Sequence, residues 1–133
     1  MDLKAADYVV VIVSDLDKSL HFYTEVLGLP LHHRAPNDKF AELDTGVTHI
    51  ALYTREGMAE TLKREISAPD KSQPGFELGF KVDDVDAAYA EALAAGAESA
   101  VEPTTKFWGQ RTAYVYDPDG HLIEFAQDLP KDD

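Results

Sequence analysis

The sequence contains no cysteine, which excludes disulfides, thiolate metal sites and cysteine nucleophiles. It has no run of about 18 apolar residues, so a membrane-spanning helix is not expected. The motifs GxGxxG, GxxxxGK[ST], GxSxG and HExxH are also missing, which removes familiar dinucleotide, phosphate, hydrolase and zinc-protease signatures. The remainder is an ordinary globular composition: 133 residues, 44% hydrophobic, the usual size of one domain.

Positive charge is scarce. Lys and Arg number 12 against 25 Asp and Glu, a formal net charge of −13. Phosphate backbones repel such a surface, so nucleic acid is excluded as an expected partner, whereas a cationic small ligand is compatible. For acidity alone, plain solubility is the simpler explanation. The N-terminal stretch has only a short apolar part, residues 8–13, with acidic residues on both sides. No export signal is therefore predicted, and a cytoplasmic location is the default expectation.

An internal repeat organises the chain. VSDLD at 13–17 resembles VDDVD at 82–86, at an offset of 82 − 13 = 69 residues. Each motif opens a segment with helical spacing of apolar residues that ends in glycine, at residues 15–28 and 84–96. Asp15, or the serine before it, is the expected N-cap of the first helix.

Segments typical of β-strands surround each predicted helix in the same order. One precedes the helix and three follow it, at 8–13, 29–34, 39–44 and 47–53 in the first half and at 76–82, 98–103, 111–117 and 121–125 in the second. Each half therefore reads β-α-β-β-β, and two such halves usually pack around a shared core. We expect a single domain, 1–133, with module one at about 7–54, a linker at about 55–75, module two at about 76–127 and a tail at 128–133. The first half of the linker could form one helix.

These motifs resemble those of the vicinal oxygen chelate superfamily, which contains glyoxalase I, bleomycin-resistance proteins, fosfomycin-resistance enzymes and extradiol dioxygenases. The resemblance covers about residues 7–127 and rests on VSDLDKSLHFYTEVLGL (13–29), VDDVDAAYAEALAAGA (82–97) and RTAYVYDPDGHLIEF (111–125). It implies an α+β fold in which two tandem βαβββ modules form curved mixed sheets around a cleft, with helices on the outer faces. It also implies a homodimer, with the cleft built within one chain or across two. The superfamily hosts enzymes and non-catalytic drug binders, so it does not specify the function.

The resemblance also implies four metal-ligand positions, here Tyr8, Ala51, Glu77 and Glu124. Alanine cannot coordinate a metal, and neutral tyrosine is a weak ligand because its usual pKa is about 10. The two carboxylates suit an oxygen-preferring divalent metal, which would need waters or substrate for its other positions. The cofactor is therefore left open, with a divalent metal as the less favoured alternative. His49, two residues before Ala51 on the same strand face, is interpreted as a cleft-wall or edge histidine.

Without a metal, Glu77 and Glu124 form an acid pair that suits a general base or a grip on a cationic ligand. A solvated outer face would produce the same alternation around Glu77, and only the inferred fold turns this side chain inward. Both residues are the candidate catalytic residues.

Strand alternation predicts an aromatic lining for the cleft, which describes a small-molecule site. The expected ligand-binding residues are Tyr8, His49, Tyr53, Trp108, Arg111, Thr112, Tyr114 and Tyr116. Trp108 and Arg111 belong to a loop placed at the cleft mouth, and the Trp-Gly pair resembles the bleomycin-resistance-like branch. Trp108 could stack on a ligand or pack in a dimer interface or at a sheet edge. Arg111 could pair with a ligand carboxylate or with Glu124, and a structural ion pair is the more frequent outcome.

Two functions follow. The first is a small-molecule-binding protein of the bleomycin-resistance-like kind, which sequesters an amphipathic or cationic ligand. The second is a divalent-metal-dependent lyase or isomerase of the glyoxalase-like kind that uses Glu77 and Glu124 in proton transfer next to a carbonyl. Loss of both histidine ligands favours the binder, and retention of both carboxylates favours the enzyme. Catalysis is thus left open.

Overall fold

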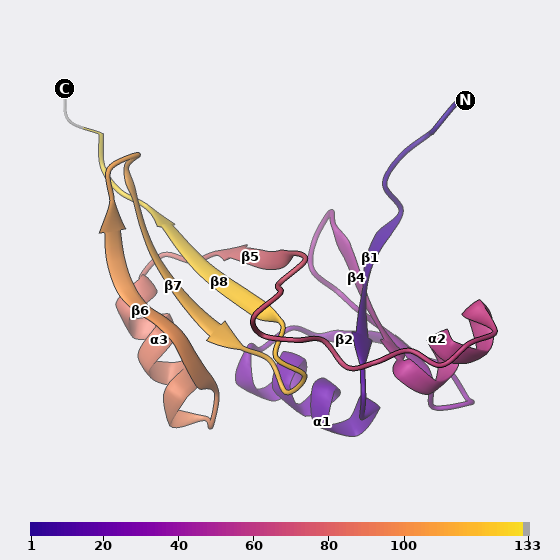
Figure 1. Cartoon of the computed structure of the whole chain (residues 1–133). Helices are drawn as coiled ribbons and strands as arrows, with labels where there is room; N and C mark the ends of the chain where they lie inside the picture. The colour runs from indigo at the N-terminus through magenta and orange to yellow at the C-terminus, as the bar shows by residue number, and fades with distance from the viewer. Residues whose placement is uncertain (132–133) are drawn as a thin grey trace. The chain divides into compact units, whose positions relative to one another are not determined.

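The computed structural model describes residues 1–131 of the chain. The chain divides into two compact units, Met1–Ala68 and a second that begins at Pro69. Each unit holds one four-stranded sheet with its own helices, and the second is labelled β5 to β8 with α3 in Figure 1. The predicted α+β class with tandem βαβββ modules is confirmed. No helix in the described part of the chain is both long and apolar enough to cross a membrane.

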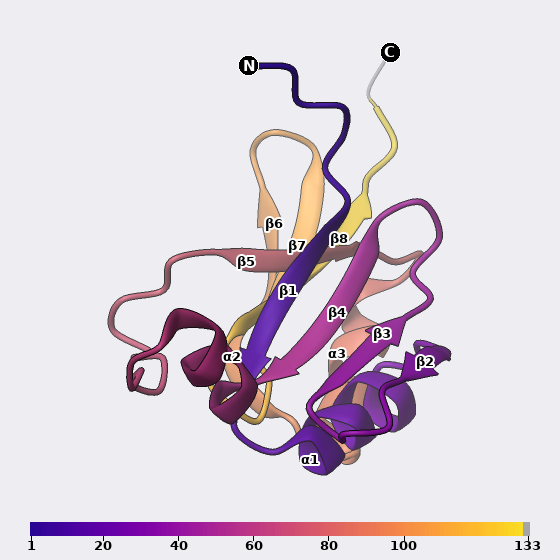
Figure 2. The same cartoon turned by 90° about the vertical axis from the view of Figure 1, so that its right-hand side faces the viewer.

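The first unit orders its strands β1-β4-β3-β2, with β1 parallel to β4 and the other pairs antiparallel (Figure 2). The helical segment after β1 begins as an α-helix and continues as wider π-type turns. Its elements are β1 (Tyr8–Val13), α1 (Leu16–Leu20), η1 (His21–Val26), β2 (Leu31–Arg34), β3 (Phe40–Leu43), β4 (His49–Thr54) and α2 (Arg55–Leu62).

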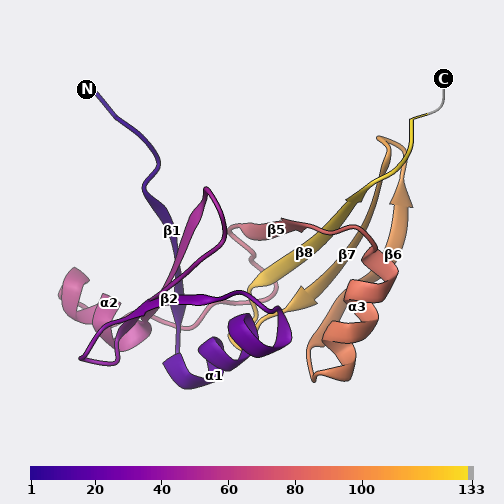
Figure 3. The ribbon, with the colours of Figure 1, turned by 180° about the vertical axis from the view of Figure 1, so that it is seen from behind.

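The second unit repeats this arrangement in the order β5-β8-β7-β6, with β5 parallel to β8. Its helix packs against one face of the sheet, as the view from behind in Figure 3 shows. Its elements are β5 (Glu77–Lys81), α3 (Val85–Ala94), β6 (Glu98–Lys106), β7 (Gln110–Tyr116) and β8 (Leu122–Asp128).

The repeated motif acts as a helix start in both units. Asp15 and Asp84 are the N-caps, and each carboxylate accepts a hydrogen bond from the backbone N–H three residues later at 3.1 Å. This satisfies one of the N–H groups that the first helical turn leaves without a partner.

Alternation then sets the two faces of each sheet. Ile123 and Phe125 of β8, with Val115 of β7, are buried on the side that α3 covers. In the first unit, Ile50 and Leu52 of β4 are likewise buried on the side that α1 covers. The residues between them consequently lie on the opposite face, as expected for strands.

The chain just before β5 is fastened to the second unit. The Lys71 ammonium lies 2.7 Å from the Glu98 carboxylate and 4.5 Å from the centre of the Tyr116 ring. Segment 69–75 therefore belongs to the surface of this unit, and it covers part of the face on which Tyr116 lies.

Candidate functional site

A row of three residues crosses the second sheet on the face opposite α3. Glu124 in the middle of β8 pairs with Gly79 of β5 on one side and with Tyr114 of β7 on the other. The Tyr114 hydroxyl donates a hydrogen bond of 2.6 Å to Glu124 Oε2. Glu77 of β5 lies on the same face of the sheet, because it is two residues before Gly79 on the same strand. The sheet thus places both predicted carboxylates on one side.

Tyr114 is held in its neutral form by this setting. Burial, the hydrogen bond to Glu124 and the negative charges of Glu124 and Glu77 raise the pKa of the phenol well above its ordinary value of 10.0. The hydroxyl is therefore a hydrogen-bond donor throughout the physiological range and does not become a phenolate. Two carboxylates therefore lie near one hydroxyl group, which can donate a full hydrogen bond to only one of them at a time.

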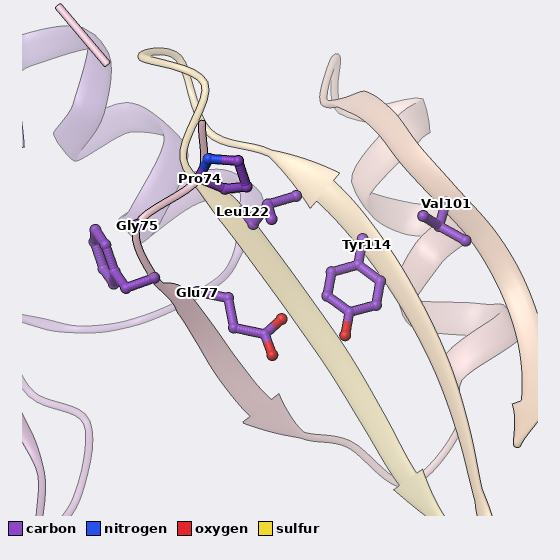
Figure 4. Close-up of a pocket in the computed structure, with 7 residues that line it drawn as sticks. Pro74, Gly75, Glu77, Val101, Tyr114 and Leu122 are labelled. Carbon is purple, nitrogen blue, oxygen red and sulfur yellow. The ribbon is translucent and has the colours of Figure 1, made fainter. Parts of the chain in front are cut away.

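A pocket of about 440 Å³ opens beside this pair. Glu77 and Tyr114 are its polar side chains, and Phe76, Val101 and Leu122 supply apolar walls. Figure 4 shows the Glu77 carboxylate and the Tyr114 hydroxyl turned toward the same region in front of β8. A mostly apolar pocket with two convergent polar groups has the character of a small-molecule site.

Gly79 keeps the space that the Glu124 side chain occupies. A Cβ atom built on Gly79 would lie 3.1 Å from Glu124 Oε1, closer than most side-chain contacts. Reasoning from the sequence missed this residue, although an isolated glycine inside an alternating strand signals a close approach.

The first sheet carries the residues expected to complete the lining. Tyr8 pairs with His49 across β1 and β4, and Ala51 pairs with Glu42 of β3. His49 Nδ1 lies 2.7 Å from Glu42 Oε1. Reasoning from the sequence missed Glu42. It pairs with Ala51 of β4 just as Tyr114 pairs with Glu124 of β8, so Glu42 and Tyr114 occupy equivalent positions in the two sheets. Alternation in KFAELD, residues 39–44, was the available signal.

Tyr53 lies against helix α2. A Cβ atom built on Gly57 would meet its ring at 2.4 Å, and its hydroxyl lies 3.1 Å from the Thr61 hydroxyl. Phe40 joins the rings of Tyr8 and Tyr53, with centroid distances of 6.4 and 6.2 Å. These contacts make one aromatic cluster on the face that also carries Ala51.

Three more ligand-binding candidates are buried or make contacts within the second unit. Thr112 is 2% exposed, and Tyr116 lies under Lys71. Arg111 donates through two guanidinium nitrogens to the Asp86 carboxylate of α3, at 2.7 and 2.8 Å, and does not pair with Glu124. The exposed carboxylate raises the pKa of Arg111, and the guanidinium lowers the pKa of Asp86.

Trp108 lies in the turn between β6 and β7. Its side chain is 57% exposed, its Nε1 donates to Gln110 Oε1 at 3.0 Å, and the Phe107 ring lies 5.0 Å away edge-on. Gly109 follows with a φ of +91°, which favours glycine. The tryptophan is thus available to a ligand or to a partner surface.

The donor set is a poor fit for a resident metal ion. Within residues 1–131, no three His, Cys, Asp or Glu side chains come together as a metal-binding group. Glu77 and Glu124 share a neutral phenol instead of an imidazole. Two carboxylates alone would leave most coordination positions to water or substrate.

A family model described as the Glyoxalase/Bleomycin resistance protein/Dioxygenase superfamily matches residues 5–125. The sequence is 39% identical to the uncharacterized protein YraH of Bacillus subtilis, over 89% of this chain and 94% of that one. It is 31% identical to a lactoylglutathione lyase of Haemophilus influenzae, over 86% of each chain. Among solved structures, TnmS3, an antibiotic binding protein from Streptomyces sp. CB03234, is 27% identical with a TM-score of 0.69 and covers 96% of this chain and 98% of its own.

Proposed function

Because the chain belongs to the glyoxalase/bleomycin resistance protein/dioxygenase superfamily, we propose that it binds and sequesters a small amphipathic molecule that carries a cationic group. The second sheet supplies the anionic end of this site through Glu77 and Glu124. Tyr8, His49 and Tyr53 form a further candidate ligand-binding face on the first sheet, and the protein acts as a homodimer.

One observation carries the proposal: a single neutral phenol faces two carboxylates. The Tyr114 hydroxyl donates its hydrogen bond to Glu124, so the exposed Glu77 carboxylate presents a negative charge at the pocket. An organic ammonium group brings the missing positive charge and, if protonated, the missing N–H donors. The net charge of −13 favours the approach of such a cation.

The apolar part of the ligand is matched by the other walls of the pocket. Phe76 and the Tyr114 ring offer aromatic surfaces on which a cation or a flat ring can rest. The volume of about 440 Å³ is in the range of roughly 300–1,000 Å³ typical of small-molecule pockets. The likeness to TnmS3, whose name describes antibiotic binding, supports sequestration over turnover.

A metal-dependent lyase or isomerase is the competing function. Its support is the name of the Haemophilus influenzae relative and the presence of two carboxylates on one sheet face. In that case Glu124 would move the proton. The donor set argues against it, since Tyr8 and Glu77 stand at the two positions where the resemblance implies imidazole ligands.

Calorimetry with benzyltrimethylammonium, benzyl alcohol and toluenesulfonate tests the proposal. We expect only the cation to bind, and Glu77→Gln and Glu124→Gln each to weaken it about tenfold, which corresponds to loss of one charge interaction of about 1.4 kcal/mol. Glu91→Gln on α3 is the matched control, because it removes the same charge from an exposed site on the helix. Equal binding of the three probes, or equal binding by all variants, would refute the proposal.

Metal analysis of protein purified without chelator separates the two functions. Near-stoichiometric divalent metal that disappears in both Glu77→Gln and Glu124→Gln would favour the lyase. Metal-free protein that binds the cation, with quenching of Trp108 fluorescence, would favour sequestration.

A further inference from the structure

A buried aspartate–histidine pair lies in the turn between β7 and β8, outside the site described above. The Asp117 side chain is 0% exposed and that of His121 is 9% exposed. Backbone N–H groups of Asp119 and His121 donate to Asp117 Oδ1 at 3.0 and 2.8 Å. The ring atom Nδ1 of His121 lies 2.9 Å from Asp117 Oδ2. Gly120, with a φ of +90°, closes the turn that brings the two side chains together.

This contact determines what the imidazole can offer. With Nδ1–H donated to the carboxylate, Nε2 of the neutral ring keeps its lone pair and acts as an acceptor. Nε2 has no hydrogen-bonding partner among residues 1–131. An acceptor without a partner in the protein can take a hydrogen bond from a donor group of a bound molecule.

A pocket of about 240 Å³ is lined by His121. The Phe76 ring, 5.7 Å from the imidazole, forms a flat apolar wall, and Pro69 and Pro74 add to it. A cavity of about 150 Å³ is enough for a benzene-sized ring. The pocket shares Phe76 and Leu122 with the larger pocket beside Glu77, so it adjoins the cation site.

We propose that this pocket is a second binding subsite, which takes a neutral, flat ring bearing a hydroxyl or N–H donor, with His121 Nε2 as the acceptor. Asp117 is the positioning residue, because it fixes the ring orientation and the tautomer. Phe76 packs on the face of the guest ring. The subsite needs no cation and therefore holds whether or not Glu77 binds one.

Phenol and anisole test this subsite, since a methyl group in anisole replaces the donated proton of phenol. Imidazole ¹H–¹⁵N spectra of the whole chain follow His121 among its five histidines, and His121→Gln assigns its signals. We expect phenol to shift the His121 Nε2 signal saturably and to bind about three- to tenfold more tightly than anisole, the range of one net hydrogen bond. His32→Gln, at an exposed position of β2 in the first unit, should leave the effect intact.

The outcomes are decisive in each direction. An equal or absent response of His121 to phenol and anisole would overturn the proposal, and this comparison uses the unaltered protein, so it does not depend on whether a variant folds. In His121→Gln, checked by thermal melting, the preference for phenol should vanish. In Glu77→Gln the phenol response should persist, which separates failure of this subsite from failure of the cation site.

Discussion

Replacing Tyr114 with phenylalanine removes one hydroxyl from the centre of the candidate site and leaves its ring in place. The Glu124 carboxylate, half-buried, then loses the donor that lies 2.6 Å away. Hydrogen bonds to charged groups contribute about 1.5–3 kcal/mol, and partial access of water lowers this, so we expect a loss of about 1–2 kcal/mol in the free energy of unfolding at pH 7. For a chain of this size the midpoint of thermal unfolding should fall by about 3–8 °C.

The same variant should respond differently to alkali. Because the pKa of Tyr114 is raised in the folded protein, both states keep the proton below pH 10, and only the unfolded state loses it above. The stabilisation from this group is therefore complete below pH 10 and is lost as the pH rises toward the folded-state pKa. The stability difference between the unaltered protein and Tyr114→Phe should narrow in that window.

Urea unfolding followed by circular dichroism at pH 7 and above pH 10 measures both effects. Tyr116→Phe is the matched control, because it removes a hydroxyl two residues away on the same face and keeps the ring that Lys71 contacts. A Tyr114→Phe variant that is no less stable than Tyr116→Phe at pH 7, or whose loss of stability is unchanged in alkali, would refute this role of the hydroxyl.

Three further changes test other parts of the structure. Gly57→Ala should displace the Tyr53 ring, because a Cβ atom would meet this ring at 2.4 Å. We expect the free energy of unfolding to fall by about 1–3 kcal/mol, which a lower urea midpoint would measure, and NMR spectra should show the changed ring contact. Asp86→Asn should slightly lower the free energy of unfolding at neutral pH, because it removes the ion pair with Arg111. Since this pair lowers the pKa of Asp86, the difference in stability from the unaltered protein should vanish as the pH falls through that pKa. A difference that stays constant with pH would contradict this role of the ion pair. Leu52→Ala, at a fully buried position, should cost about 2–5 kcal/mol in urea unfolding, and a cost below 1 kcal/mol would exclude it from the core.

Periodicity and the repeat predicted which side of each strand a residue occupies. Asp15 and Asp84 cap their helices as the repeated motif indicated, because a cap depends on residues close in the sequence, where steric rules and hydrogen-bonding rules act directly. Glu77, Glu124 and Tyr114 lie on one face of the second sheet, and predicting this required the inferred fold as well as alternation, since they belong to three different strands.

Partners between distant residues could not be predicted in the same way. Arg111 and Asp86 are 25 residues apart, and their pairing depends on how α3 packs on β6 and β7. The contact of Glu42 with His49 likewise depends on the register of β3 and β4. Alternation gives a face, whereas register and helix packing decide which neighbour lies on it.

The lysine that rests on Tyr116 also bears on how the chain can be divided. Sequence similarity starts the second copy at Phe76, but Lys71 and its contact with Glu98 are contributed by the residues just before it. The second compact unit therefore begins at Pro69, before the start of the duplicated stretch at Phe76. A truncated protein that starts at Phe76 would expose an aromatic ring and an unmatched carboxylate together, so a half-length version intended for ligand screening should start no later than Pro69.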